Sequence, residues 1–115
     1  MEMKKVSYDK SNSVEVETGY IIDNYIGADM GIGHSVVRSH LSGKHPKMKN
    51  ISSDRTYYII DGCGKFSSNG KTIEVAKGDM LVVPKDTIYE FEGKFDAILI
   101  SCPAFNPNDD VIYRD

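Results

Sequence analysis

The sequence predicts an all-β domain of antiparallel strands, and three observations support this fold class. Short segments rich in Tyr, Ile, Val and Phe recur through residues 55–102. Turn residues such as Gly, Asn-Gly and Pro-Lys-Asp interrupt these segments at intervals of about eight to ten residues. No apolar pattern with the period of a helix competes with them. Together these features are typical of a β-sandwich or a β-barrel.

Turn chemistry places the strand ends within this region. The Asn-Gly pair at 69–70 tolerates positive φ, so it predicts a tight hairpin between the strands that contain Phe66 and Ile73. The Gly-Asp pair at 78–79 starts a further strand, which Pro84 ends because proline has no N–H to give to a central ladder. We therefore expect two hairpins in succession.

Two segments resemble the conserved motifs of small single-domain cupins. They are Tyr-Ile-Ile-Asp-Gly-Cys-Gly at 58–64 and Gly-Asp-Met-Leu-Val-Val-Pro at 78–84. The resemblance extends over roughly residues 41–107, and it implies a cupin-type antiparallel jelly-roll β-barrel and a homodimer. Residues 41–115 would be the cupin core of a single domain. Residues 1–40 would supply N-terminal strands and a loop, which belong either to the same barrel or to a dimer arm.

The metal site of the family is degenerate in this sequence. A typical cupin binds a divalent metal through two histidines and a glutamate in its first motif and one histidine in its second. The resemblance places these positions near Met48 and Asn50, at Arg55 and at Tyr89. A guanidinium stays protonated at any ordinary pH and is no ligand, so we expect no metal or other cofactor. A rebuilt metal site would have to draw on the histidines, which are His34, His40 and His45.

An alternating segment at 34–41 is the first candidate for a binding face. Side chains of an extended segment alternate between two faces, so Arg38 and His40 share the face of His34 and Val36. If this face points into the barrel, Arg38 and His40 bind the ligand, because such groups are not buried without partners. If it points outward, it is a solvated surface. The sequence alone leaves both registers open.

Arg55 and Tyr89 occupy two former ligand positions, and the resemblance therefore implies that they face the barrel interior. Arg55 would either bind a ligand anion or pair with a carboxylate such as Asp61 or Glu90. Strand alternation places Tyr57 on the face of Arg55, where a phenol offers an aromatic ring and a hydrogen-bonding group. The predicted ligand-binding residues are thus Arg38, His40, Arg55, Tyr57 and Tyr89.

Two classes of function follow. In the first, the protein is a metal-independent cupin that binds a small anionic metabolite, and the basic residues of 43–55 attract its carboxylate or phosphate. In the second, it is a metal-free isomerase or epimerase-type enzyme with a histidine base, His40 or His45, and a tyrosine acid, Tyr57 or Tyr89. A metal-dependent cupin enzyme would need the rebuilt ligand set. The loss of every usual ligand favours the binding protein.

Composition limits the remaining possibilities. The chain has 115 residues, a net charge of −3 and a pI near 5.6, which predicts one domain without a basic surface for nucleic acid. No long apolar stretch or secretory signal is present, so we expect a cytoplasmic protein that does not enter a membrane. Cys63 and Cys102 lack a CxxC spacing and are expected to be reduced thiols.

Overall fold

The structure is a computed structural model, and it describes residues 2–114. In this part of the chain eight antiparallel strands form one sheet with the order β1-β2-β3-β7-β4-β5, while β6 pairs with β4 and β8 pairs with β3. No helix of residues 2–114 is long and apolar enough to cross a membrane. The strands are β1 (Ser13–Glu17), β2 (Tyr20–Ile26), β3 (Ser35–Asn50), β4 (Asp54–Ser68), β5 (Lys71–Ala76), β6 (Met80–Val83), β7 (Tyr89–Cys102) and β8 (Asp110–Tyr113). The 3₁₀ turns are η1 (Lys10–Asn12), η2 (Ala28–Met30) and η3 (Pro107–Asp109).

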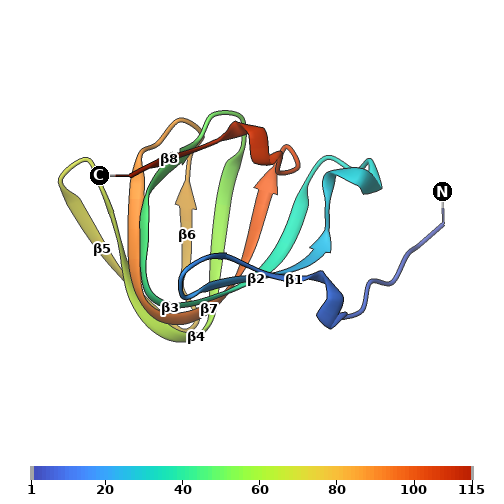
Figure 1. Ribbon diagram of the computed structural model, residues 1–115, viewed down its shortest axis with the longest axis horizontal. Coiled ribbons are helices and arrows are strands. Elements are labelled where there is room, and N and C mark those ends of the chain that lie inside the picture. Colours follow the sequence, from blue (N-terminus) through green and yellow to red (C-terminus); the bar gives the residue numbers. More distant parts are fainter. Residues whose placement is uncertain (1, 115) are drawn as a thin grey trace.

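The sheet curls because its three long central strands bend together. Gly43 of β3 and Gly64 of β4 both lie opposite Gly93 of β7, so a row of glycines crosses the sheet at one level. A Cβ atom on Gly93 would lie 2.5 Å from the Cα of Gly64, which only glycine avoids at such a tight bend. Figure 1 shows the result, a U-shaped sheet with β8 lying across its open side. The predicted all-β cupin-type barrel is thus observed.

The strand pairing confirms one predicted hairpin and corrects the other. Asn69 and Gly70 have φ values of 54° and 77°, and they join β4 to β5 with Ser68 opposite Lys71. The strand before Pro84 also forms, as β6. However, β6 does not pair with its sequence neighbour β5 but with the first half of β4, where Arg55 lies opposite Val83. The long, bent β4 therefore pairs with β5 beyond the bend and with β6 before it.

The N-terminal segment joins the sheet of its own chain. Strand β1 pairs with β2, and Val14 lies opposite Ile22. This is the arrangement expected if residues 1–40 contribute to the same barrel. Val14 and Val16 are about half exposed, and their side chains form part of a cavity wall.

An aromatic cluster fills much of the inside of the curl. The rings of Phe66 and Phe91 are stacked with centroids 5.0 Å apart, and the ring of Phe95 is 5.8 Å from that of Phe66. All three are at most 4% exposed. Tyr57 and Tyr89 pack on the same rings, each about 6 Å from Phe91. This cluster therefore holds both tyrosines in place.

Candidate active site

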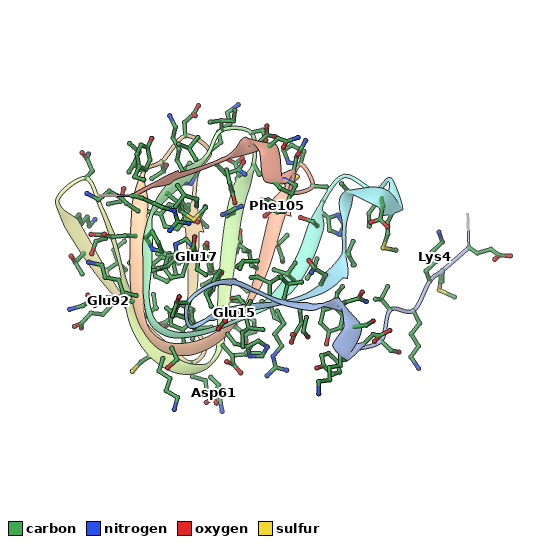
Figure 2. All side chains as sticks on the ribbon, in the orientation of Figure 1. Lys4, Glu15, Glu17, Asp61, Glu92 and Phe105 are labelled. Atoms are coloured by element: carbon green, nitrogen blue, oxygen red, sulfur yellow. The ribbon has the colours of Figure 1, made fainter. Side chains whose placement is uncertain are left out.

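A cavity of about 430 Å³ lies inside the curled sheet, a size typical of small-molecule sites. Strands β1, β2, β3, β4 and β7 and the C-terminal segment 105–112 contribute to its walls. In Figure 2, Glu17 of this wall lies within the U of the ribbon, whereas Asp61 lies outside its bend. The apolar part of the wall consists of Val14, Val16, Ile22, Val37, Leu99 and Ile112, and the polar part includes Tyr20, His45, Arg55, Tyr57 and Asp110.

Arg55 faces this cavity from the inner side of β4, and its side chain is 6% exposed. Nη2 donates to Oδ1 of Asp110 at 3.0 Å, and Nη1 donates to the hydroxyl of Tyr89 at 3.2 Å. The guanidinium carbon lies 5.3 Å from the ring centre of Phe105. Burial opposes the charge, but Tyr57, Tyr89 and Asp110 outweigh this effect and hold the pKa of Arg55 above its ordinary value. Arg55 is thus a cation with a carboxylate already beside it.

The partner of Arg55 corrects a prediction. Asp61 was expected on the inner face with Arg55, but it is exposed and lies outside the bend. The reason is a register shift between Ile59 and Asp61 in the pairing of β4 with β7, because a bulge of one residue reverses the face of every side chain beyond it. Glu90, the other expected partner, pairs instead with Lys44 at 3.7 Å.

Tyr57 and Tyr89 form one hydrogen-bonded unit with Arg55, in agreement with the expectation that the three face the interior. Their hydroxyl oxygens are 2.6 Å apart, and the exposed fractions are 1% for Tyr57 and 2% for Tyr89. Burial raises the pKa of Tyr57 well above its ordinary value, and the neighbouring Tyr89 raises it further. Tyr57 lines the cavity itself, whereas Tyr89 does not line it and reaches it only through its hydrogen bond to Tyr57. Tyr57 therefore faces the cavity as a protonated phenol.

His45 of β3 lines the same cavity and is 4% exposed. Its ring stacks on Phe91 with centroids 4.6 Å apart and meets the edge of Tyr20 at 5.0 Å. Nδ1 lies 2.7 Å from the carbonyl oxygen of Pro46. A carbonyl only accepts, so Nδ1 carries the ring proton and Nε2 of the neutral ring is the free acceptor. Burial lowers the pKa of His45 below its ordinary value, which favours this neutral form.

Arg38 and His40 do not face the cavity, and this corrects the prediction that they bind the ligand there. Strand β3 turns Val37 and its alternate neighbours inward, so Arg38 and His40 lie on the outer face. Arg38 pairs with Asp96 at 3.2 Å. Nε2 of His40 lies 2.7 Å from Asp23, and Nδ1 lies 3.0 Å from Asp96. The carboxylates of Asp23 and Asp96 thus satisfy Arg38 and His40 on the outer face. His34 precedes β3 and does not line the cavity either.

The polar or aromatic residues of the site that were not predicted from the sequence include Glu17, Tyr20, Phe105 and Asp110. Tyr20 is buried beside His45 and Phe91. Phe105 and Asp110 reach Arg55 because β8 pairs with the end of β3, where Asp110 lies opposite Asn50. None of them belongs to a motif. The short Val-Ile-Tyr run at 111–113, which consists of residue types favoured in strands, was a local sign that a strand follows the barrel.

Comparisons with known proteins identify the fold. No protein-family model matches the chain. It is 27% identical over 114 residues to the uncharacterized protein MJ1618 of Methanocaldococcus jannaschii, with 93% of this chain and 90% of that protein covered. The structure is similar to that of a Streptomyces Pac13 variant with uridine, with a TM-score of 0.83, 29% identity and coverage of 97% of this chain and 93% of that chain. Ectoine synthase from P. lautus has a TM-score of 0.76 at 11% identity, over 92% and 83% of the two chains. The chain has the cupin fold.

Pac13 is described as a unique nucleoside dehydratase, and that structure matches this cupin with a TM-score of 0.82 at 27% identity over 96% of this chain and 92% of that one. Three further Pac13 structures contain uridine. In two of them a tyrosine is replaced by phenylalanine, and in the third a histidine is replaced by glutamine.

The usual metal position of a cupin does not fit a cation in this chain. Arg55 and Tyr89 take two of the ligand positions, and the guanidinium of Arg55 is itself a cation. The sulfur of Met48 lies 3.9 Å from Nη1 of Arg55, and the amide oxygen of Asn50 accepts from the backbone N–H groups of residues 52–53. Nowhere in residues 2–114 do three or more His, Cys, Asp or Glu side chains form a group that could hold a metal ion.

Proposed function

We propose that this cupin binds a uridine-like nucleoside in its cavity and catalyses the loss of water from the sugar. The observation that carries the proposal is the placement of a buried neutral histidine, His45, and a protonated tyrosine, Tyr57, on one cavity. The similarity to Pac13 along nearly the whole chain supports a nucleoside as the ligand. A histidine and two tyrosines are also the residue types replaced in the Pac13 complexes with uridine.

The cavity offers each part of a nucleoside a suitable surface. Apolar side chains such as Val37 and Leu99 can pack on the flat base, while the hydroxyl groups of the ribose need hydrogen-bonding partners. The carboxylates of Glu17, which pairs with Arg114, and of Asp110, which pairs with Arg55, lie at the same cavity and offer their remaining lone pairs as acceptors. The charge of Arg55 is balanced by Asp110, so an uncharged ligand meets no unpaired cation there.

Dehydration requires a base and an acid. Nε2 of His45 removes a proton from a sugar carbon, and the electron pair of that C–H bond expels hydroxide from the neighbouring carbon as a double bond forms. Tyr57 gives its phenolic proton to the hydroxide, which leaves as water. Tyr89 then donates a hydrogen bond to the phenolate, and Arg55 donates a hydrogen bond to the hydroxyl of Tyr89. The proton on His45 returns to Tyr57, so the net products are the unsaturated nucleoside and water.

This chemistry also restricts the substrate. A neutral imidazole removes a proton from carbon at a useful rate only when a carbonyl group next to that carbon stabilises the resulting charge. An ordinary ribose has no such group, so the substrate is a nucleoside whose sugar carries a carbonyl. Uridine oxidised to an aldehyde at its primary alcohol is the simplest probe of this kind. Unmodified uridine is then a ligand that binds without reacting.

The test is to incubate the protein with this aldehyde and to analyse the products by mass spectrometry. We expect a product lighter by one water, no product with His45→Gln, and a rate lowered at least about tenfold with Tyr57→Phe. His34→Gln is the matched control, since His34 lies outside the cavity, and it should react like the wild type. If the wild type binds uridine but does not turn over the aldehyde, that result would refute the enzyme and leave a binding protein.

A further inference from the structure

Two serines face each other on the inner side of the sheet and form part of the cavity wall. Ser35 of β3 lies directly opposite Ser101 of β7, and both side chains line the cavity. Ser35 is 4% exposed and Ser101 is 2% exposed. Directly opposed side chains of an antiparallel pair have Cβ atoms about 5 Å apart. The serine pair, Ser35 and Ser101, therefore holds two hydroxyl groups close together at the cavity.

The serine pair has hydrogen-bonding capacity that the described part of the chain, residues 2–114, does not use. The hydroxyl oxygen of Ser35 accepts from the backbone N–H of Phe105 at 2.9 Å, which leaves its own O–H free to donate. The hydroxyl of Ser101 has no hydrogen-bonding partner in these residues, although the side chain is almost fully buried. Buried hydroxyl groups nearly always have a partner, so Ser101 requires an explanation.

A third serine shows how the same strand treats a buried hydroxyl away from the cavity. Ser39 lies on the same face of β3, is 0% exposed and donates to the carbonyl oxygen of Ala97 at 3.3 Å. Ser39 is not part of the cavity wall. The serine that faces the sheet is thus satisfied by the chain, whereas Ser101 directs an unpartnered hydroxyl into the cavity. Since an unpartnered buried hydroxyl is costly, this arrangement points to a ligand that supplies the partner.

The surroundings of the serine pair suit the edge of a flat ring. The next inward positions along the two strands are Val37 of β3 and Leu99 of β7, which again lie opposite each other and line the cavity. The wall therefore changes from apolar to hydroxyl-bearing within one step along both strands. Phe105, which donates to Ser35, lines the cavity as well. A ring with apolar faces and a polar edge matches this sequence of surfaces.

We propose that the serine pair binds the polar edge of the nucleobase and selects a base that carries carbonyl and N–H groups, as uracil does. This inference rests on the proposed nucleoside function and adds the recognition of the base to it. Ser35 donates its free O–H to a carbonyl oxygen of the base. Ser101, whose hydroxyl both donates and accepts, pairs with the neighbouring N–H or carbonyl group.

The position of the serine pair agrees with the chemistry proposed for the sugar. Ser35 and His45 lie on opposite arms of β3, because the strand bends at Gly43 between them (Figure 1). Both side chains line the same cavity. A base held at the serine pair therefore leaves the sugar to extend towards His45, the proposed base of the dehydration.

The test compares two ligands by calorimetry, uridine and its analogue in which a phenyl ring replaces uracil on the same ribose. The wild type should bind uridine at least about tenfold more tightly, because a site built for hydrogen bonds rejects an analogue that cannot form them. Ser101→Ala should lower this preference to about threefold or less, and the double variant Ser35→Ala/Ser101→Ala should remove it. Since Ser101 has no partner within residues 2–114, Ser101→Ala should leave the unfolding free energy undiminished, unlike the loss of a structural hydrogen bond.

Ser39→Ala is the matched control, because it removes a buried hydroxyl from the same face of β3 outside the cavity, and it should keep the wild-type preference. Circular dichroism checks the fold of each variant. A wild type without the preference, or a double serine variant that retains it, would overturn this inference alone if uridine still binds and the aldehyde is still dehydrated. A wild type that binds neither ligand would refute the nucleoside site and this inference with it. A preference that depends on the serines in a protein that does not dehydrate the aldehyde would support this inference and refute only the proposed reaction.

Discussion

Replacing Asp110 by asparagine tests whether the buried charge of Arg55 depends on this one carboxylate. The substitution keeps the shape of the side chain and removes only its charge. Breaking a buried ion pair by removing one partner costs about 3–5 kcal/mol, because the other charge is left uncompensated. Asp110 is 21% exposed while Arg55 is 6% exposed, so water replaces part of the lost interaction. We therefore expect Asp110→Asn to lower the free energy of unfolding by about 2–4 kcal/mol.

The chain offers a matched control for this experiment. Arg38 and Asp96 form an ion pair of nearly the same length, 3.2 Å against 3.0 Å, but their side chains are 40% and 30% exposed. An exposed pair of this kind contributes about 1 kcal/mol or less, so Asp96→Asn should be the milder change. Urea unfolding followed by circular dichroism suits the comparison, because the chain has no tryptophan for fluorescence. If Asp110→Asn costs no more than Asp96→Asn, the charge of Arg55 does not depend on Asp110.

Three further predictions concern His45, Tyr57 and one glycine. Burial lowers the pKa of His45 below its ordinary value of 6.5, so the unfolded chain takes up this proton at higher pH than the folded chain. The stability that neutral His45 contributes is therefore complete above about pH 6.5 and is lost as the pH falls below it. Urea unfolding of His45→Gln across this range should not show this loss of unfolding free energy. Tyr57→Phe should lower the unfolding free energy by only about 1–2 kcal/mol while dehydration slows at least about tenfold, and equal rates for variant and wild type would remove Tyr57 from the chemistry. Gly62 has a φ of +81°, and a Cβ there would lie 2.2 Å from the carbonyl oxygen of Lys94, so Gly62→Ala should cost more than about 2 kcal/mol. Gly70→Ala is the control, because φ there is +77° and no atom lies within 4 Å of the added Cβ. It should cost about 1 kcal/mol in the same thermal or urea unfolding. Equal costs for the two variants would contradict the clash at Gly62.

The sequence predicted those features that depend on local chemistry and motif spacing. The Asn-Gly turn at 69–70 fixes its hairpin through backbone conformation alone. The spacing of the two cupin motifs brought Arg55, Tyr57 and Tyr89 together as one interior group. Alternation along the strand was enough to place Tyr57 on the face of Arg55, because no irregularity separates the two, whereas the place of Tyr89 came from the motif resemblance.

The features that the sequence did not predict depend on contacts between distant segments. One bulge near Ile59 reverses the face of Asp61. The adjoining Gly62, with a φ of 81°, was a local sign of this bulge, because an isolated glycine within a strand often marks one. Arg38 and His40 lie on the outer face because the other side of β3 packs on the aromatic core, and strand alternation alone does not say which side that is. Asp110 enters the site only because β8 pairs with β3, so a carboxylate with no motif around it becomes the partner of Arg55. The histidine that lines the cavity, His45, was one of two candidate bases, with His40, that the sequence could not separate.

The most direct test of the central claim is a calorimetric titration of the protein with uridine, repeated with Val37→Phe. Val37 lines the cavity, and the larger ring of phenylalanine takes up part of the space beside the base while His45, Arg55 and Tyr57 are kept. We predict that the wild type binds uridine and that Val37→Phe does not, with the fold of the variant checked by circular dichroism. No binding by the wild type, or equal affinity for both proteins, would contradict the assignment of this cavity as a nucleoside site.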